Sequence, residues 1–93
     1  MNQLSWTISA SGTADELRQA IRDHEEQDLR HFPQSERLLA HHVLGHVLSV
    51  AEEHDRIQGE PKRYVLIGNG SENHAAGWSD IRVDMHVDHG AGS

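Results

Sequence analysis

Alternating apolar and polar residues predict three strands. Segment 4–10 (LSWTISA) places Leu, Trp, Ile and Ala at every second position, which is typical of a strand with one buried face. Segment 80–88 (DIRVDMHVD) alternates in the same way, with charged residues and histidine on its polar side. Segment 63–68 (RYVLIG) is rich in β-branched and aromatic residues and predicts the remaining strand.

A capping box predicts the start of the first helix. Thr13 is followed three residues later by Glu16, and each side chain can accept a hydrogen bond from an orphan backbone N–H group at a helix N-terminus. We therefore expect a helix from about Ala14. It must end before Pro33, because proline keeps the residue before it out of the helical conformation.

The second predicted helix runs from about residue 36 to 57, with Ser35 as its N-cap. At about 100° per residue, its apolar side chains sweep an arc of about 180°, wider than a surface helix needs. The arc consists of Leu39, Ala40, Val43, Leu44, Val47, Leu48, Val50 and Ala51. We expect this helix to form the centre of the core and part of it to face a second subunit, so that the protein is a homo-oligomer.

The predicted order of elements is β-α-α-β-β. This order indicates an α+β fold, a two-layer sandwich in which a helical hairpin packs on a small, mainly antiparallel sheet. Residues 1–89 are expected to form a single domain, because 93 residues are too few for two, and residues 90–93 to form a flexible tail. Segment 69–78 (NGSENHAAGW) is expected to be a long loop between the last two strands.

Composition excludes several classes of function. The formal net charge is −7, which argues against broad nucleic-acid binding and against an anionic membrane surface, because both need clustered Lys and Arg. The chain has no cysteine, hence no disulfide framework. It also has no apolar run near the about 20 residues of a membrane span and no export signal at its start, so we expect a cytoplasmic protein without membrane contact.

Two groups of residues are candidates for a divalent metal such as Zn. Imidazoles four residues apart on a helix can chelate one ion, and carboxylates and imidazoles two residues apart share one face of a strand. The helical group is His42, His46 and Glu53, and the strand group is Asp84, His86, Asp88 and His89. The alternative for both is an ordinary solvated surface, and a zinc-protease helix is excluded because no glutamate lies between His42 and His46.

The Gly- and Asn-rich segment is a candidate ligand site. Successive glycine and asparagine residues can turn backbone N–H groups toward an anion, and two adjacent cations precede the segment. The candidate ligand-binding residues are Lys62, Arg63, Asn69, Gly70, Asn73, His74, Trp78 and Arg82. No P-loop or dinucleotide-binding motif is present, so the expected ligand is a small anion of unspecified type, held by residues that converge within one chain or across subunits.

Two motifs together cover about half of the sequence. The first is the opening strand, which runs through SASGT into a capped helix. The second is the last third of the chain, which reads as a strand, a loop, a GW pair and a closing strand. These two motifs resemble small uncharacterised proteins of actinobacterial phages. In those proteins a histidine more often follows the first glycine of the loop, whereas Asn69 follows Gly68 here and His74 comes later. The resemblance implies a phage setting and no particular chemistry.

We therefore expect a non-enzymatic binding protein, a phage accessory protein that sequesters a small, nucleotide-like host molecule or blocks a host protein. No nucleophile with a positioned base can be assembled from the motifs, so no catalytic residue and no cofactor are expected. The alternatives are a metal-binding or metal-dependent hydrolytic protein and a virion structural or assembly component.

Overall fold

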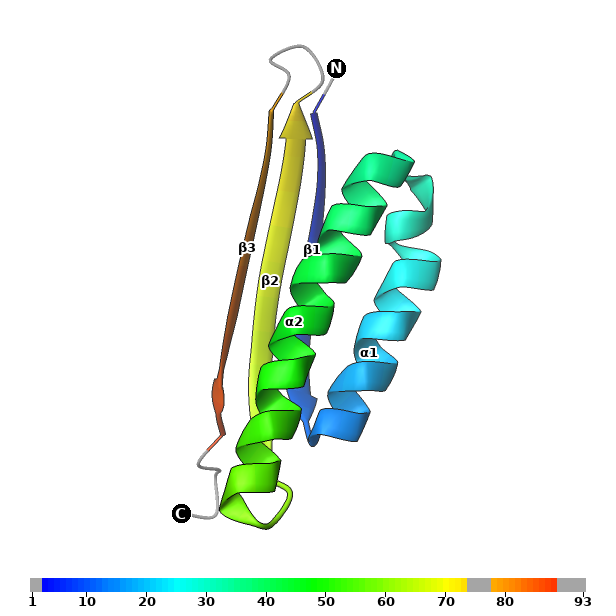
Figure 1. The fold of residues 1–93 in the computed structure, drawn as a ribbon. Helices are drawn as coiled ribbons and strands as arrows, with labels where there is room; N and C mark the ends of the chain where they lie inside the picture. Colours follow the sequence, from blue (N-terminus) through cyan, green and yellow to red (C-terminus); the bar gives the residue numbers. More distant parts are fainter. Residues whose placement is uncertain (1–2, 74–77, 89–93) are drawn as a thin grey trace.

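The computed structural model describes residues 3–73 and 78–88 and confirms the predicted order of elements. The elements are β1 (Gln3–Gly12), α1 (Ala14–Gln27), the short 3-10 helix η1 (Leu29–His31), α2 (Gln34–Gln58), β2 (Tyr64–Asn73) and β3 (Trp78–Val87). One layer is a pair of helices and the other is a three-stranded antiparallel sheet, as Figure 1 shows. The predicted α+β fold class is therefore confirmed.

β2 is the central strand, between β1 and β3. β1 and β2 pair along all ten residues although the whole helical hairpin separates them in the sequence. α1 packs over β1, and α2 lies over both β2 and β3 (Figure 1). Since α1 and α2 also contact each other, the helices form a continuous layer on one face of the sheet.

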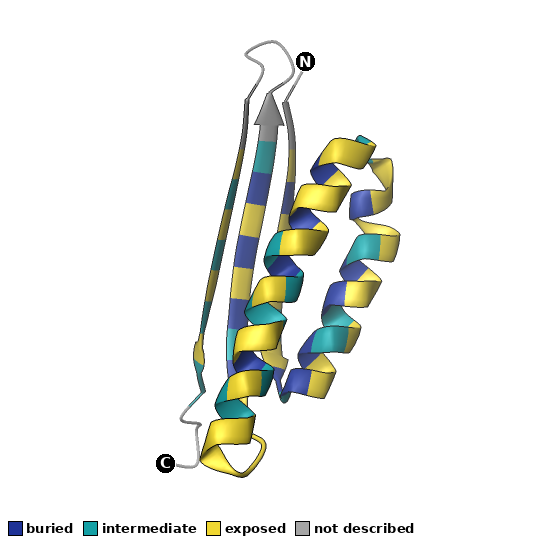
Figure 2. Ribbon diagram, viewed as in Figure 1, coloured by how far each residue is buried: buried dark blue, intermediate teal, exposed yellow. Residues whose placement is uncertain are grey.

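The register assigns every described side chain of the sheet to one of two faces. Tyr64 and Leu66 point toward the helices and are buried, whereas Val65 and Ile67 lie on the open face. Figure 2 shows this alternation of buried and exposed residues along β2. The open face carries Ser5, Thr7, Ser9, Ser11, Val65, Ile67, Asn69, Ser71, Asp80, Arg82, Asp84 and His86.

Two glycines of β2 allow large side chains of β1 to lie across the centre of the sheet. A Cβ atom on Gly70 would lie 2.5 Å from the Trp6 ring, and one on Gly68 would lie 3.2 Å from Ile8. The prediction of a loop over residues 69–78 was therefore wrong, because β2 continues to Asn73 and β3 begins at Trp78. The glycines that indicated a loop serve close packing inside a strand.

The helix termini agree with the sequence at one helix and differ at the other. Glu16 N–H donates to Thr13 Oγ1 and Thr13 N–H donates to Glu16 Oε1, so the predicted capping box is present. α2, however, begins at Gln34, and Pro33 rather than Ser35 occupies the N-cap position without a side-chain hydrogen bond. Pro33 already has a helix-compatible φ of −56°, which lets the helix start directly after it.

Substitution of Gly70 by Ala should destabilise the protein by about 1 to 3 kcal/mol, because the new methyl group would overlap the buried Trp6 ring. Substitution of Gly45, in α2, should have the opposite effect: a Cβ atom there would meet nothing within 4 Å, so Gly45→Ala should stabilise by about 1 kcal/mol through helix propensity. Urea unfolding measures both. Equal effects of the two substitutions would contradict this account of the glycines.

Candidate functional site

A hydrogen-bond network at the end of α2 centres on Tyr64, which is only 1% exposed. The Tyr64 hydroxyl lies 2.5 Å from Asp55 Oδ1, 3.0 Å from the Ala51 carbonyl oxygen and 3.0 Å from His54 Nδ1. Asp55 Oδ1 also accepts a hydrogen bond from the Lys62 backbone N–H at 2.9 Å. The network thus ties the last turns of α2 to the start of β2.

The network determines which nitrogen of His54 carries the proton. Asp55 Oδ1 and the Ala51 carbonyl oxygen can only accept, so the single hydroxyl hydrogen of Tyr64 must be donated to one of them. The hydroxyl oxygen then accepts from His54 Nδ1–H. The neutral His54 ring is therefore the Nδ1–H tautomer, and its Nε2 is an acceptor that becomes a donor when the ring is protonated.

The same network disfavours ionisation of Tyr64. Burial, followed by the hydrogen bond to Asp55 and the negative charge of that carboxylate, raises the pKa of Tyr64 to about 12. The hydroxyl is consequently a permanent donor near neutral pH. Its function in the site is to hold Asp55 and His54 in position.

A cavity of about 390 Å³ adjoins this network. Its lining residues come from the end of α2, the start of β2 and the end of β3: His54, Gln58, Lys62, Arg63, Val87 and Asp88. We call it the basal cavity. It brings together Lys62 and Arg63, both predicted to bind a ligand, with Asp88 from the predicted metal group and with His54.

The backbones of Lys62 and Arg63 are fixed by hydrogen bonds, whereas their side chains form only exposed ion pairs. The Lys62 N–H is bound by Asp55, and the Arg63 carbonyl oxygen accepts from the Asp88 N–H at 2.8 Å. Their side chains reach acids that are more than half exposed, since Lys62 Nζ lies 2.6 Å from Glu60 and Arg63 lies 3.5 Å from Glu16. Exposed ion pairs contribute little stability, so an anion in the cavity can compete for both cations.

The structure distributes the other predicted ligand residues over different surfaces. Asn69 and Arg82 are cross-strand neighbours on the open face, whereas Gly70 lies beneath Trp6. Asn73 and Trp78 are paired at the far end of β2 and β3, about 30 Å of strand from Arg63. His74 is outside the described residues. Within one chain, therefore, Lys62 and Arg63 do not converge with the predicted ligand residues that the structure describes on β2 and β3.

Within residues 3–73 and 78–88, no group of three or more potential metal ligands is close enough to hold an ion. His42 and His46 are both exposed on α2, but Glu53 forms an ion pair with Arg56. On β3, Asp84 and His86 project from the open face, and Asp88 follows the strand at the basal cavity. His89 lies outside the described residues.

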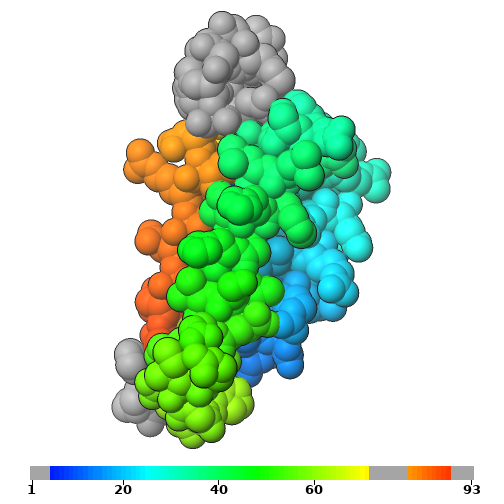
Figure 3. Space-filling model, viewed as in Figure 1, coloured from blue at the N-terminus to red at the C-terminus, as the bar shows by residue number. Residues whose placement is uncertain are grey.

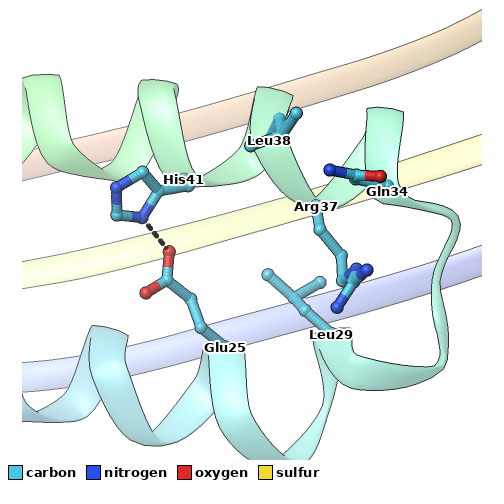
Figure 4. Close-up of a pocket in the computed structure, with 6 residues that line it drawn as sticks. All are labelled: Glu25, Leu29, Gln34, Arg37, Leu38 and His41. Carbon is cyan, nitrogen blue, oxygen red and sulfur yellow. Dashed lines mark hydrogen bonds and ion pairs between the residues drawn. The ribbon is translucent and has the colours of Figure 1, made fainter.

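A second cavity, of about 300 Å³, lies where the two helices meet (Figure 4). Glu25 on α1 is bound to His41 Nδ1 on α2, and the side chains of Leu29 and Leu38 supply apolar surface. Figure 4 shows the Arg37 side chain reaching toward Leu29. Its acidic group is bound to His41, and its lining includes one cationic side chain, Arg37, whereas two line the basal cavity.

Near this end of the molecule, the core encloses three polar side chains. His24 and Glu36 are 5% and 2% exposed, and Trp6 Nε1 lies 3.5 Å from Glu36 Oε2. The His24 ring packs on Trp6 at 5.2 Å and binds Asp28 through Nδ1, and its buried Nε2 has no partner among the described residues. This cluster is part of the core packing, and two surface cavities adjoin it: one of about 370 Å³ beside His24 and Asp28, and one of about 550 Å³ beside Trp6 and Asp28.

Sequence reasoning missed Asp55 and Tyr64, which organise the basal cavity. His54 follows the apolar arc of α2 by one helical turn, and it is half-buried and hydrogen-bonded. A tyrosine at the first position of a strand directly after a helix was the available signal for its partner.

No protein-family model matches this chain, and neither a curated protein nor a solved structure matches it. No helix in the part of the chain that the structure describes is both long and apolar enough to cross a bilayer.

Tyr64 is the single tyrosine of the chain, so its titration can be followed directly by the absorbance of tyrosinate. We expect a midpoint near 12 in the folded protein and near 10 in concentrated urea. Because the pKa is higher in the folded state, this contribution to the free energy of unfolding is complete below pH of about 10 and is lost as pH rises through about 12. A folded-state midpoint near 10 would contradict the network, and Tyr64→Phe should abolish the signal.

Proposed function

We propose that this protein is a non-enzymatic binding protein that captures a small anionic molecule in the basal cavity. The observation that carries the proposal is the convergence of Lys62, Arg63 and His54 on one cavity of about 390 Å³. A volume of this size lies at the lower end of the range for small-molecule sites. It suits a phosphate-bearing group of nucleotide size better than a larger ligand.

The three groups have complementary roles in this proposal. Lys62 and Arg63 exchange their exposed partners, Glu60 and Glu16, for the anion. His54, whose Nδ1 is held by Tyr64, contributes an imidazole ring of fixed orientation to the wall of the cavity. Asp88 at the rim disfavours a fully charged phosphate and favours a partly neutralised one, such as a phosphodiester.

The biological setting follows from the sequence resemblance alone. A phage accessory protein that sequesters a small nucleotide-like host molecule needs tight, stoichiometric capture and no turnover. A cavity with cations and no assembled nucleophile and base among its lining residues supports capture over catalysis.

Isothermal titration with inorganic phosphate, AMP and cyclic AMP tests the proposal. We expect at least one probe to bind, because each carries an anionic phosphate that can replace Glu60 and Glu16 at the two cations. Lys62→Gln combined with Arg63→Gln should weaken binding at least tenfold.

The matched control is Arg22→Gln combined with Arg30→Gln, which removes the same charge from exposed positions on α1 and η1. This control should bind like the unmodified protein. Equal affinity of both double variants, or no binding of any probe, would refute the basal cavity as the site.

A further inference from the structure

The edge strand β3 has an apolar face that the helices cover only in part. Ile81, Val83, Met85 and Val87 point toward the helical layer but are all half-buried, whereas Leu66 beside them on β2 is fully buried. Figure 3 shows β3 exposed along one side of α2, while α1 occupies the other side. Among the described residues, the helical layer therefore has no helix beside α2 at the β3 edge of the sheet.

α2 exposes a second apolar surface next to this strand. Leu39, Val50 and Ile57 are 43%, 48% and 67% exposed, and Val43 is half-buried. Together with His46 and Glu53, they follow one another at spacings of 4, 3, 4, 3 and 4 residues. This is the spacing of a seam that packs against another helix, and we call these six residues the α2 seam.

The outer edge of β3 presents a regular row of backbone N–H and C=O groups. The Asp88 N–H donates to the Arg63 carbonyl oxygen at 2.8 Å, and Asp88 and Arg63 extend the β2–β3 register. Since bonded and non-bonded pairs alternate in an antiparallel ladder, the even-numbered residues of β3 bind β2. The backbone groups of Ile81, Val83 and Met85 then point away from the sheet, toward a further strand.

We propose that a second copy of this chain pairs with β3, antiparallel and centred on Val83, and joins the two sheets into one of six strands. In this register Arg82 lies opposite Asp84 of the second copy, and Asp80 lies opposite its His86. The two Arg82–Asp84 pairs across the junction are then of opposite charge, and each Asp80 lies opposite an imidazole. Centring on Arg82 would instead oppose two arginines, and centring on Asp84 two aspartates, so the alternation of charge favours a centre on an odd-numbered residue. Of these, Val83 lies nearest the middle of β3 and gives the longest overlap of the two strands.

The helices fit this arrangement. α2 contacts both β2 and β3, whereas α1 packs over β1, so α2 is the helix nearer the β3 edge of the sheet. Pairing of β3 with its counterpart therefore brings the two α2 helices to the two sides of the twofold axis, where helices can pack against each other. Each α2 then covers the apolar face of β3 on its own side and meets its counterpart along the seam.

The position of the α2 seam along the helix axis also agrees with a twofold axis at Val83. His54 and Val87 line the same cavity, and four strand residues from Val87 to Val83 rise about 13 Å, equal to about nine residues of α2. The twofold axis therefore crosses α2 near residue 45. Leu39 of one copy then faces Val50 of the other across the axis.

Light scattering of the full chain at tens of micromolar should give about twice the 10.4 kDa mass of one chain. Arg82→Glu places like charges opposite each other twice and should weaken the dimer at least tenfold. Adding Asp84→Arg to that variant exchanges the charges within each pair and should restore the affinity to within about threefold. Both positions lie on the open face, so neither substitution disturbs the core.

The helical part of the interface has its own matched pair. Val50→Asp in the seam should dissociate the dimer, whereas Leu38→Asp, which is equally exposed on another side of α2, should not. Circular dichroism shows whether each variant is folded, and the charge exchange on β3 remains decisive if Val50→Asp unfolds. A 10.4 kDa mass for the unmodified protein, or a failure of Asp84→Arg to restore association, would overturn the proposal.

Discussion

Two helices must cover a sheet of three ten-residue strands, and this shortage of helical surface determines which side chains are buried. β2 lies between the other two strands beneath the helical layer, and its inward-facing residues from Tyr64 to Gly70 are all buried. The fully buried residues Leu44 and Leu66 lie in the middle of the sandwich, whereas all the inward-facing residues from 81 to 87 on β3 are only half-buried. The partly exposed apolar face of β3 beside α2 is a direct result of this shortage of helical surface.

The periodic parts of the sequence predicted their structure well. The alternation in segments 4–10 and 80–88 and the capping box at Thr13 correspond to β1, β3 and the start of α1. These signals succeed because each depends on one element and on the direction of its own side chains. The strand β2 was predicted too short, since Gly68 and Gly70 are explained only by Ile8 and Trp6, which lie some sixty residues earlier in the chain.

The candidate site was harder to predict for the same reason. Lys62 and Arg63 were recognised by their charge, but the other predicted ligand residues were grouped with them by nearness in sequence. A ten-residue strand separates its two ends by about 30 Å, so proximity along β2 does not mean proximity in space. Asp55 enters the site because one helical turn brings it beside Ala51, near the Tyr64 hydroxyl, and no motif records that contact.

The long-range pairing of β1 with β2 has a consequence for how the chain folds. Ile8 lies opposite Gly68, so sixty residues must be ordered or looped out before this ladder can close, whereas β2 and β3 are neighbours in sequence. Closing a loop of that length is entropically costly, and folding slows as the mean separation of contacts grows. The helical hairpin and the β2–β3 hairpin are local units that can form first. β1 then pairs with the free edge of β2 beneath α1, and Trp6 enters the space beside Gly70, which completes the sheet.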